Sequence, residues 1–241
     1  MTIFSPDAVK GVIFDYGATI DSNGKHWAEV IWEGYVAASV PVSKEDFRQA
    51  YVHGERTLAT HPLIAPQHNF LDLLRIKTDI QFDYLLQHNL ISERSSETVE
   101  KVAIYCYAYA ARCISAAKPL LERLAKHYPM VLVSNFYGNI EAVLDDFGLL
   151  PLFPQIVESA VVGVRKPDPA IFALGIERLH MSPDQVVVIG DSYSKDIVPA
   201  TSLGCQTIWI KGIGWDDKEE DIRHACTISD FQELSDLFFL K

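Results

Sequence analysis

Five short apolar runs rich in β-branched residues constrain the fold of this chain most strongly. They lie at residues 12–14, 130–133, 156–157, 186–189 and 207–210. Short apolar runs of this kind are typical of strands buried on both faces. Segments with helical spacing, such as 140–147 and 169–179, separate the later runs. This alternation predicts an α/β fold in which helices cover both faces of a parallel sheet.

The stretch at 21–113 differs from the rest of the chain in its hydrophobic pattern. Its apolar residues recur at helical spacing, as they do around Trp27 and Phe70, and no convincing strand interrupts it. We therefore expect a helical insert between the first strand and the rest of the sheet.

Individual helix starts are also indicated. One helix should follow Ser43, and another should follow Ser92 or Ser95 and include the run at 99–113. A polar loop at 215–220 should precede a final helix near 231–240.

Composition narrows the function classes. A net charge of -11 and an isoelectric point near 5.1 argue against a general nucleic-acid binder, since phosphate backbones are held by clustered Lys and Arg. No apolar run approaches 18 residues and no signal peptide is evident, so we expect a cytoplasmic protein without a membrane partner. The four cysteines form no C-x-x-C pair and are expected to be buried thiols. The oligomeric state is left open.

Polar, reactive residues directly follow three of the apolar runs. Asp15 follows the first, Ser134 and Asn135 the second, and Asp191 the fourth. Ligands of open parallel sheets bind outside the carboxyl ends of the strands. These positions are therefore the candidates for a site.

Lys166 completes the set, in a loop that two prolines stiffen. The carboxylates of Asp15 and Asp191 would bind a hard cation such as Mg²⁺. The Lys166 ammonium, with Ser134 and Asn135, would neutralise an anion that has three oxygens, which suits phosphoryl transfer. We expect the side chains of residues 15, 166 and 191 to meet in one cleft.

The four segments resemble, in order and character, the four motifs of the haloacid dehalogenase superfamily of hydrolases. The segment at 14–19 is similar to motif I, the pair at 134–135 to motif II, the pair at 166–167 to motif III, and the segment at 190–192 with Asp196 to motif IV. The resemblance covers nearly the whole chain. It implies a Rossmann-like core at residues 1–20 and 114–241 and a helical cap at 21–113 that excludes water and selects the substrate.

The resemblance also implies roles for single residues. Asp15 would be the nucleophile that attacks phosphorus, while Ser134, Asn135 and Lys166 would hold the phosphoryl oxygens. Mg²⁺ would be bound by Asp15, by Asp191 and by the main-chain carbonyl of Gly17. Thr19 and Asp196 would support this arrangement. The expected activity is Mg²⁺-dependent hydrolysis of a small phosphorylated metabolite through an aspartyl-phosphate on Asp15.

One departure from the family pattern concerns Gly17. Most phosphatases of the family carry a second Asp there, which protonates the leaving oxygen and then activates water. General acid/base assistance is typically worth about 10² to 10⁴ in rate, so an unassisted alkyl phosphate would be a poor substrate. Metal binding survives the change, because glycine supplies the same backbone carbonyl.

Four explanations for Gly17 remain open at this point. Asp21 or His26 could replace the acid, or the substrate could have a good leaving group. The chemistry could be that of a phosphonatase or a dehalogenase. A phosphonatase needs a lysine of the cap, and Lys25, Lys44, Lys77 and Lys101 are candidates by location. Finally, the protein could bind phosphate or Mg²⁺ with little turnover.

Overall fold

The predicted apolar runs form strands of one parallel sheet in the computed structural model, which describes residues 4–215, 219 and 221–240. The strands are β1 (Gly11–Phe14), β2 (Met130–Ser134), β3 (Gln155–Glu158), β4 (Val186–Gly190), β5 (Gln206–Ile210) and β6 (Thr227–Ile228). Their order in the sheet is β3-β2-β1-β4-β5-β6, and every neighbouring pair is parallel. The predicted α/β fold is confirmed; β6, which has two residues, was not predicted.

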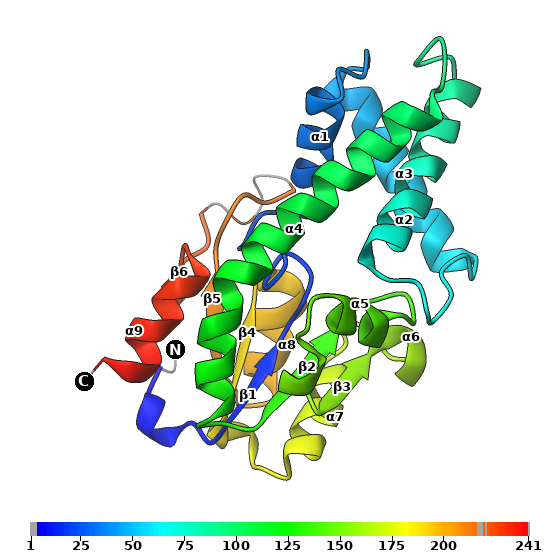
Figure 1. Cartoon of the computed structure of the whole chain (residues 1–241). Coiled ribbons are helices and arrows are strands. Elements are labelled where there is room, and N and C mark those ends of the chain that lie inside the picture. The colour runs from blue at the N-terminus through cyan, green and yellow to red at the C-terminus, as the bar shows by residue number, and fades with distance from the viewer. Residues whose placement is uncertain (1–3, 216–218, 220, 241) are drawn as a thin grey trace.

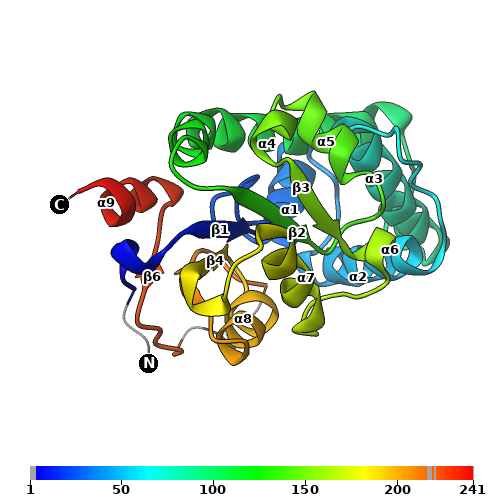
Figure 2. The ribbon, with the colours of Figure 1, turned by 90° about the horizontal axis from the view of Figure 1, so that it is seen from below.

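The sheet is buried on both faces because alternate side chains of each strand point to opposite sides. Val12 and Phe14 belong to one apolar cluster, and Ile13 belongs to the other. The first cluster includes side chains of α4, α5 and α9, and the second those of α7 and α8. Figure 2 shows these two groups of helices on opposite sides of the strands. The helices are α4 (Ser96–Ala125), α5 (Ile140–Asp146), α7 (Ala170–Leu179), α8 (Val198–Ser202) and α9 (Leu234–Phe239).

Residues 21–113 contain helices and loops but no strand, in agreement with the expected helical insert. The helices are α1 (Trp27–Ala37), α2 (Lys44–Thr60), α3 (Phe70–Gln87) and the first part of α4. In Figure 1 they form a separate group beyond the carboxyl ends of the strands. We call this group the cap helices. The division of the chain into two domains at residues 21 and 113 stays a prediction.

The ends of the cap helices follow from local capping. Helix α2 begins after Ser43, as predicted, and the Ser43 hydroxyl accepts a hydrogen bond from the backbone N–H of Asp46 at 3.1 Å. Helix α4 begins after Ser95, which agrees with one of the two predicted starts. It continues to Ala125, whereas the predicted run stopped at Cys113. The additional turns persist because their apolar side chains are buried against the sheet.

Shorter elements complete the chain. They are the 3₁₀ turns η1 (Pro6–Ala8), η2 (Leu150–Leu152), η3 (Pro183–Gln185) and η6 (Phe231–Glu233), the helix α6 (Ser159–Val162) and the π-helical turn η4 (Tyr193–Ile197). Together η6 and α9 account for the predicted final helix. Of the predicted loop at 215–220, residues 216–218 and 220 lie outside the described residues.

All four cysteines are free thiols. Cys106, Cys205 and Cys226 are buried as expected, but Cys113 is only partly buried, so the expectation was wrong for this residue. No helix in the described ranges combines the length and the hydropathy that crossing a bilayer requires.

Candidate active site

The site lies at the carboxyl edge of the sheet, where three neighbouring strands end. Asp15 follows β1, Ser134 is the last residue of β2, and Asp191 follows β4. Phe14 of β1 pairs with Leu132 of β2 on one side and with Ile189 of β4 on the other. Parallel pairing in this register brings the three polar residues to the same edge, although they are far apart in sequence.

Asp15 and Lys166 form a buried ion pair at this edge. The Lys166 Nζ lies 2.5 Å from Asp15 Oδ1 and 2.7 Å from Asp196 Oδ1. Asp15, Lys166 and Asp196 are exposed by only 6%, 4% and 2%. A buried ion pair is favourable only where the partners are in close contact, as they are here. One ammonium therefore serves two carboxylates.

Thr19 joins Asp15 to the third carboxylate. Its hydroxyl lies 2.9 Å from Asp15 Oδ2 and 3.3 Å from Asp191 Oδ1. Ligand atoms of Asp15, Asp191 and Asp196 all lie within 4.8 Å of one another. The expectation that residues 15, 166 and 191 meet is therefore confirmed by the geometry.

The pKa values of these groups reflect burial first and the neighbouring charges second. Burial raises the pKa of Asp15 to about 6, and Asp196 adds to the rise while Lys166 opposes it. Burial, followed by the charges of Asp15 and Asp196, raises the pKa of Asp191 well above its usual value. Burial alone would lower the pKa of Lys166, but Asp15 and Asp196 outweigh it and raise that pKa. The ammonium is thus held charged, and the three carboxylates still lack two neutralising charges.

The loop that carries Lys166 is held by Asn135. The Asn135 Oδ1 accepts a hydrogen bond from the Lys166 backbone N–H at 2.9 Å, and the Asn135 amide donates to the Lys166 carbonyl at 3.1 Å. This side chain orients Lys166 and fixes the distance between β2 and the loop. Ser134 is also buried, but its hydroxyl makes no hydrogen bond to another described residue and lines the cavity.

Asp196 depends on a glycine. It lies in η4, and its Oδ2 accepts a hydrogen bond from the backbone N–H of Ser192 at 3.1 Å. A Cβ atom added to Gly190 would lie 2.5 Å from the Asp196 Cβ. Only glycine lets the end of β4 approach Asp196 this closely.

The side chains of the site face a cavity of about 840 Å³ between the sheet edge and the cap helices. All the predicted site residues line it except Thr19, which lies behind Asp15 and Asp191. Gly17 also lines the cavity, and a Cβ atom added there would have no neighbour within 4 Å. The position at which the family resemblance implies a second Asp therefore has open space.

Asp21 and His26, the two candidates for the missing acid, differ in their hydrogen bonds. Asp21 Oδ1 accepts from the Ala18 N–H at 2.7 Å and Oδ2 accepts from the Trp27 indole at 2.9 Å. Both oxygens therefore stabilise the turn between β1 and α1. Burial raises the pKa of Asp21 to about 8.

His26 caps the first turn of α1, where its Nδ1 accepts from the Ala28 N–H at 3.1 Å. Burial, followed by the charge of Lys195, lowers the pKa of His26 to about 4, so the ring is neutral at neutral pH. A neutral ring that accepts at Nδ1 carries its proton on Nε2. This N–H has no partner within the described part of the chain, and His26 lines the cavity.

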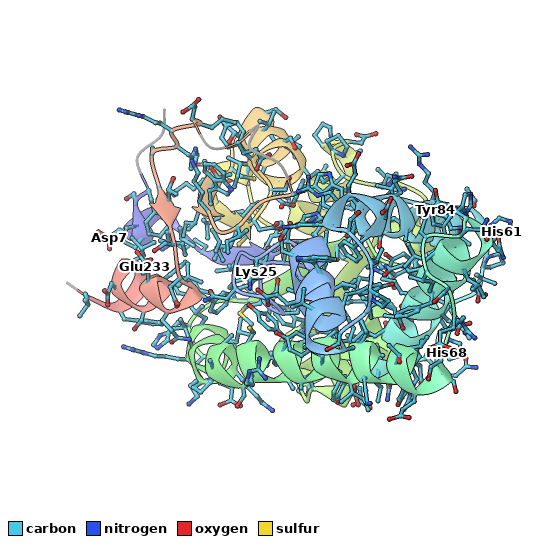
Figure 3. The ribbon with its side chains drawn as sticks, turned by 90° about the horizontal axis from the view of Figure 1, so that it is seen from above. Asp7, Lys25, His61, His68, Tyr84 and Glu233 are labelled. Carbon is cyan, nitrogen blue, oxygen red and sulfur yellow. The ribbon has the colours of Figure 1, made fainter. Side chains whose placement is uncertain are left out.

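The positions of the four candidate cap lysines separate Lys77 from the other three. Lys25, Lys44 and Lys101 pair with Glu33, Glu29 and Glu97 and do not line the cavity. In Figure 3, Lys25 lies beside α1, away from the far end of the cap helices where His61 and Tyr84 lie. Lys77 does line the cavity and contacts Glu55 at 2.7 Å.

Residues of the cavity that the sequence did not single out include Glu55, Tyr137 and Trp215. Tyr137 follows Ser134 by three residues, so the rule that reads strand ends could have found it. Glu55 and Trp215 gave no such signal, because helix packing and a loop after β5 bring them to the cavity.

Comparison with known proteins agrees with this geometry. Residues 9–204 match the model of the haloacid dehalogenase-like hydrolase family. The chain is 45% identical over 73 residues to haloacid dehalogenase-like hydrolase domain-containing protein 3 of Danio rerio, covering 30% of each protein. It is 34% identical over 90 residues to glyceraldehyde 3-phosphate phosphatase of Methanocaldococcus jannaschii, covering 37% of this chain and 40% of that protein. The matches thus span less than half of either of these curated relatives.

Solved structures share the fold across the whole chain. The HAD-hydrolase YfnB from Bacillus subtilis, solved with bound magnesium, superposes with a TM-score of 0.61 at 20% identity and covers 95% of this chain and 98% of its own. A dehalogenase solved with an intermediate complex gives a TM-score of 0.63 at 17% identity, covering 97% and 99%. The family match over most of the chain, with the motif residues assembled at one edge of the sheet, shows that this protein belongs to the haloacid dehalogenase-like hydrolases.

Proposed function

We propose that this protein is a Mg²⁺-dependent phosphatase that acts on a small phosphorylated metabolite and carries the phosphoryl group on Asp15. The observation that carries the proposal is the group of Asp15, Lys166, Asp191 and Asp196 at the wall of the cavity, in which every member is buried except the partly buried Asp191. Two similarities support it, one to a glyceraldehyde 3-phosphate phosphatase and one to a hydrolase solved with bound magnesium.

The donor set fits a hard divalent cation. Three carboxylates lie together beside one ammonium, and burial, followed by the charges of Asp15 and Asp196, raises the pKa of Asp191. Asp15, Asp191 and the Gly17 carbonyl would hold Mg²⁺, with Asp196 in support, and oxygen ligands are what Mg²⁺ prefers. Bound Mg²⁺ would polarise a phosphoryl oxygen and offset the charge that develops on it.

The chain's own residues would perform the transfer. Lys166 and Ser134 would hold the phosphoryl oxygens while an Asp15 oxygen attacks phosphorus, and the bond to the leaving oxygen breaks with its electron pair. Water then attacks the same phosphorus and breaks its bond to Asp15. Phosphate is released, Asp15 returns to a carboxylate, and the proton lost by the water balances the leaving oxygen.

Because Gly17 has no carboxylic acid, this position cannot protonate the leaving oxygen as it departs. The hydrogen bonds favour His26 over Asp21 as a donor, because both Asp21 oxygens stabilise the turn while His26 Nε2 carries a proton. A neutral imidazole donates a hydrogen bond but is a weak acid, so substrates whose leaving group needs little protonation should react fastest.

Turnover of acetyl phosphate and of p-nitrophenyl phosphate tests the proposal. We expect Mg²⁺-dependent release of phosphate that EDTA abolishes, and a loss of at least about 10³-fold in kcat for Asp15→Asn. Asp7→Asn is the matched control, because Asp7 is exposed and lies at the end of the molecule opposite the cap helices (Figure 3). Full turnover by the Asp15→Asn variant would refute the assignment of Asp15 as the nucleophile.

A dehalogenase is the second candidate, favoured by Gly17 and by the dehalogenase fold match. Asp15 would then attack carbon and displace a halide without a metal. Release of chloride from 2-chloropropionate that persists in EDTA, with no phosphate release from either phosphate substrate, would establish this reading. A phosphonatase is disfavoured, because Glu55 and Tyr137 outweigh burial and raise the pKa of Lys77, whereas an imine-forming lysine must be neutral.

A further inference from the structure

Lys77, Glu55 and Tyr137 form a closed ring of polar contacts in the wall of the cavity. The Lys77 Nζ lies 2.7 Å from Glu55 Oε1 and donates to the Tyr137 hydroxyl at 3.0 Å. The Tyr137 hydroxyl in turn donates to Glu55 Oε2 at 2.8 Å. We call these three residues the cap triad. Two of them come from α2 and α3, and Tyr137 comes from the loop after β2.

Lys77 is the buried member of the cap triad, and Glu55 and Tyr137 are partly buried. Lys77 is exposed by only 7%, and all three side chains line the same cavity as Asp15. A buried ammonium is costly unless it is paired, and Glu55 supplies the pairing charge. Apolar packing would have stabilised this position more simply, so the pair is a candidate for a binding role.

The charge of the cap triad sums to zero, since Lys77 and Glu55 carry opposite charges. A second anionic group on a substrate would therefore meet no uncompensated cation there, and Glu55 would repel it. Lys195, a further cation of the cavity wall, is exposed and lies on the sheet side, in η4. The part of the cavity near the cap helices thus disfavours a leaving group with its own negative charge.

After these contacts the cap triad still offers both hydrogen-bond donors and hydrogen-bond acceptors. Lys77 has three N–H donors, of which Glu55 and Tyr137 engage two, and one remains for a ligand. Glu55 keeps unused lone pairs on both oxygens. A hydroxyl group both donates and accepts, so adjacent hydroxyls can satisfy Lys77 and Glu55 together.

Aromatic rings cover the neighbouring wall. Tyr51 packs on Trp215 with ring centroids 5.1 Å apart and on His26 at 6.0 Å, and Trp27 lies on Phe70 at 5.2 Å. Flat apolar surfaces of this kind pack against the C–H groups of a carbon chain that bears hydroxyls. The cavity volume is also within the usual range for small-molecule sites.

We infer that the cap triad selects phosphate esters whose leaving group is uncharged and bears adjacent hydroxyls, and rejects leaving groups that carry a carboxylate. The inference rests on the proposed phosphatase activity and adds the substrate class. Glu55 is the residue that sets the preference, because it removes the net charge that Lys77 would otherwise present.

Two substrates of nearly equal shape test the inference. Glycerol 3-phosphate and 3-phosphoglycerate differ by a hydroxymethyl group in place of a carboxylate. We expect the wild-type kcat/KM to favour glycerol 3-phosphate by about tenfold or more, as for a substrate that meets a desolvated like charge. Equal kcat/KM values, or a preference for 3-phosphoglycerate, would overturn the inference.

Glu55→Gln should reverse this preference, because it leaves the Lys77 charge uncompensated. The expected ratio of the two kcat/KM values shifts by about tenfold or more toward 3-phosphoglycerate. Glu97→Gln is the matched control, since it removes the carboxylate of the exposed Glu97–Lys101 pair, and it should leave the ratio unchanged. A Glu55→Gln variant that slows both substrates equally would show a merely structural role.

If the Glu55→Gln variant folds poorly, Tyr137→Phe provides an independent test of the inference. It removes one hydroxyl and keeps both charges, so we expect KM for glycerol 3-phosphate to rise about threefold with little change in kcat. A fall in kcat with an unchanged KM would contradict the inference. Acetyl phosphate, measured in parallel, separates the two proposals: turnover without discrimination refutes only the cap triad, and no turnover of any phosphate refutes both.

Discussion

The two walls of the cavity treat charge in opposite ways. At the sheet edge Lys166 contacts two carboxylates with a third close to them, whereas in the cap triad Lys77 contacts one. The first arrangement is incomplete and needs a cation, and the second is balanced and offers hydrogen bonds. The difference teaches that the role of a buried lysine follows from its partners: with surplus acids we expect a metal and phosphate site, and with a single acid a site that discriminates between neutral and charged ligands.

The two lysines provide the strongest test of this comparison. Lys166→Met should lower kcat/KM for acetyl phosphate by about 10²- to 10³-fold, because it removes a charge that would stabilise the transferred group. Lys77→Met should cost far less with this substrate, whose leaving group bears no hydroxyl for the cap triad to bind. Steady-state kinetics of both variants, with circular dichroism to verify folding, measure the contrast. Similar losses in the two variants would break the comparison.

The substitution Gly17→Asp tests whether the sheet edge lacks a general acid. The open space at Gly17 admits a carboxyl group, which could protonate the leaving oxygen. We expect kcat for glycerol 3-phosphate to rise by about 10- to 100-fold, within the range of general acid catalysis, and kcat for acetyl phosphate to stay nearly constant. Gly17→Asn has the same size without the acid and should give no gain. A gain for both variants would point to packing instead of proton transfer.

The surplus of negative charge should also appear as instability of the metal-free protein. Folding raises the pKa of Asp191 above its unfolded value near 3.8, so the folded state binds more protons than the unfolded state above that pH. The free energy of unfolding without Mg²⁺ should therefore fall as the pH rises above about 4. Urea unfolding in EDTA at several pH values measures this slope.

Asp191→Asn provides the matching variant, since it removes one of the crowded charges. It should raise the free energy of unfolding in EDTA by about 1 kcal/mol at pH 8 while reducing the stabilisation by Mg²⁺. Asp7→Asn should change neither quantity. A destabilised Asp191→Asn protein in EDTA would mean that the carboxylates are not in surplus.

The sheet and its catalytic edge could be predicted because both are properties of strands. Runs such as that at 186–189 are readable from composition, and a parallel sheet forces the residues after them to one edge. The strand β6 was missed because two residues carry too little pattern. The full length of α4 was missed as well, since Pro119 counts against a helix by local rules while burial against the sheet overrides them.

The cap triad could not be predicted in this way. Lys77 was named only as one of several cations, and nothing in the sequence pairs it with Glu55 on another helix. Helix crossing angles decide which side chains meet, and they depend on packing over the whole interface. Asn135 illustrates the same limit at the sheet edge, where its side chain holds the backbone of Lys166.

Helix α4 has a mechanical consequence. Its 30 residues form one continuous helix that begins among the cap helices and ends alongside the sheet, and in Figure 1 it changes direction on the way. Pro119 lies within the helix and has no N–H to donate, so one backbone hydrogen bond is missing from its C-terminal part. The cap helices are thereby joined to the sheet by a helix on one side and by the loop between β1 and α1 on the other, so any change in the width of the cavity between them would act on these two connections.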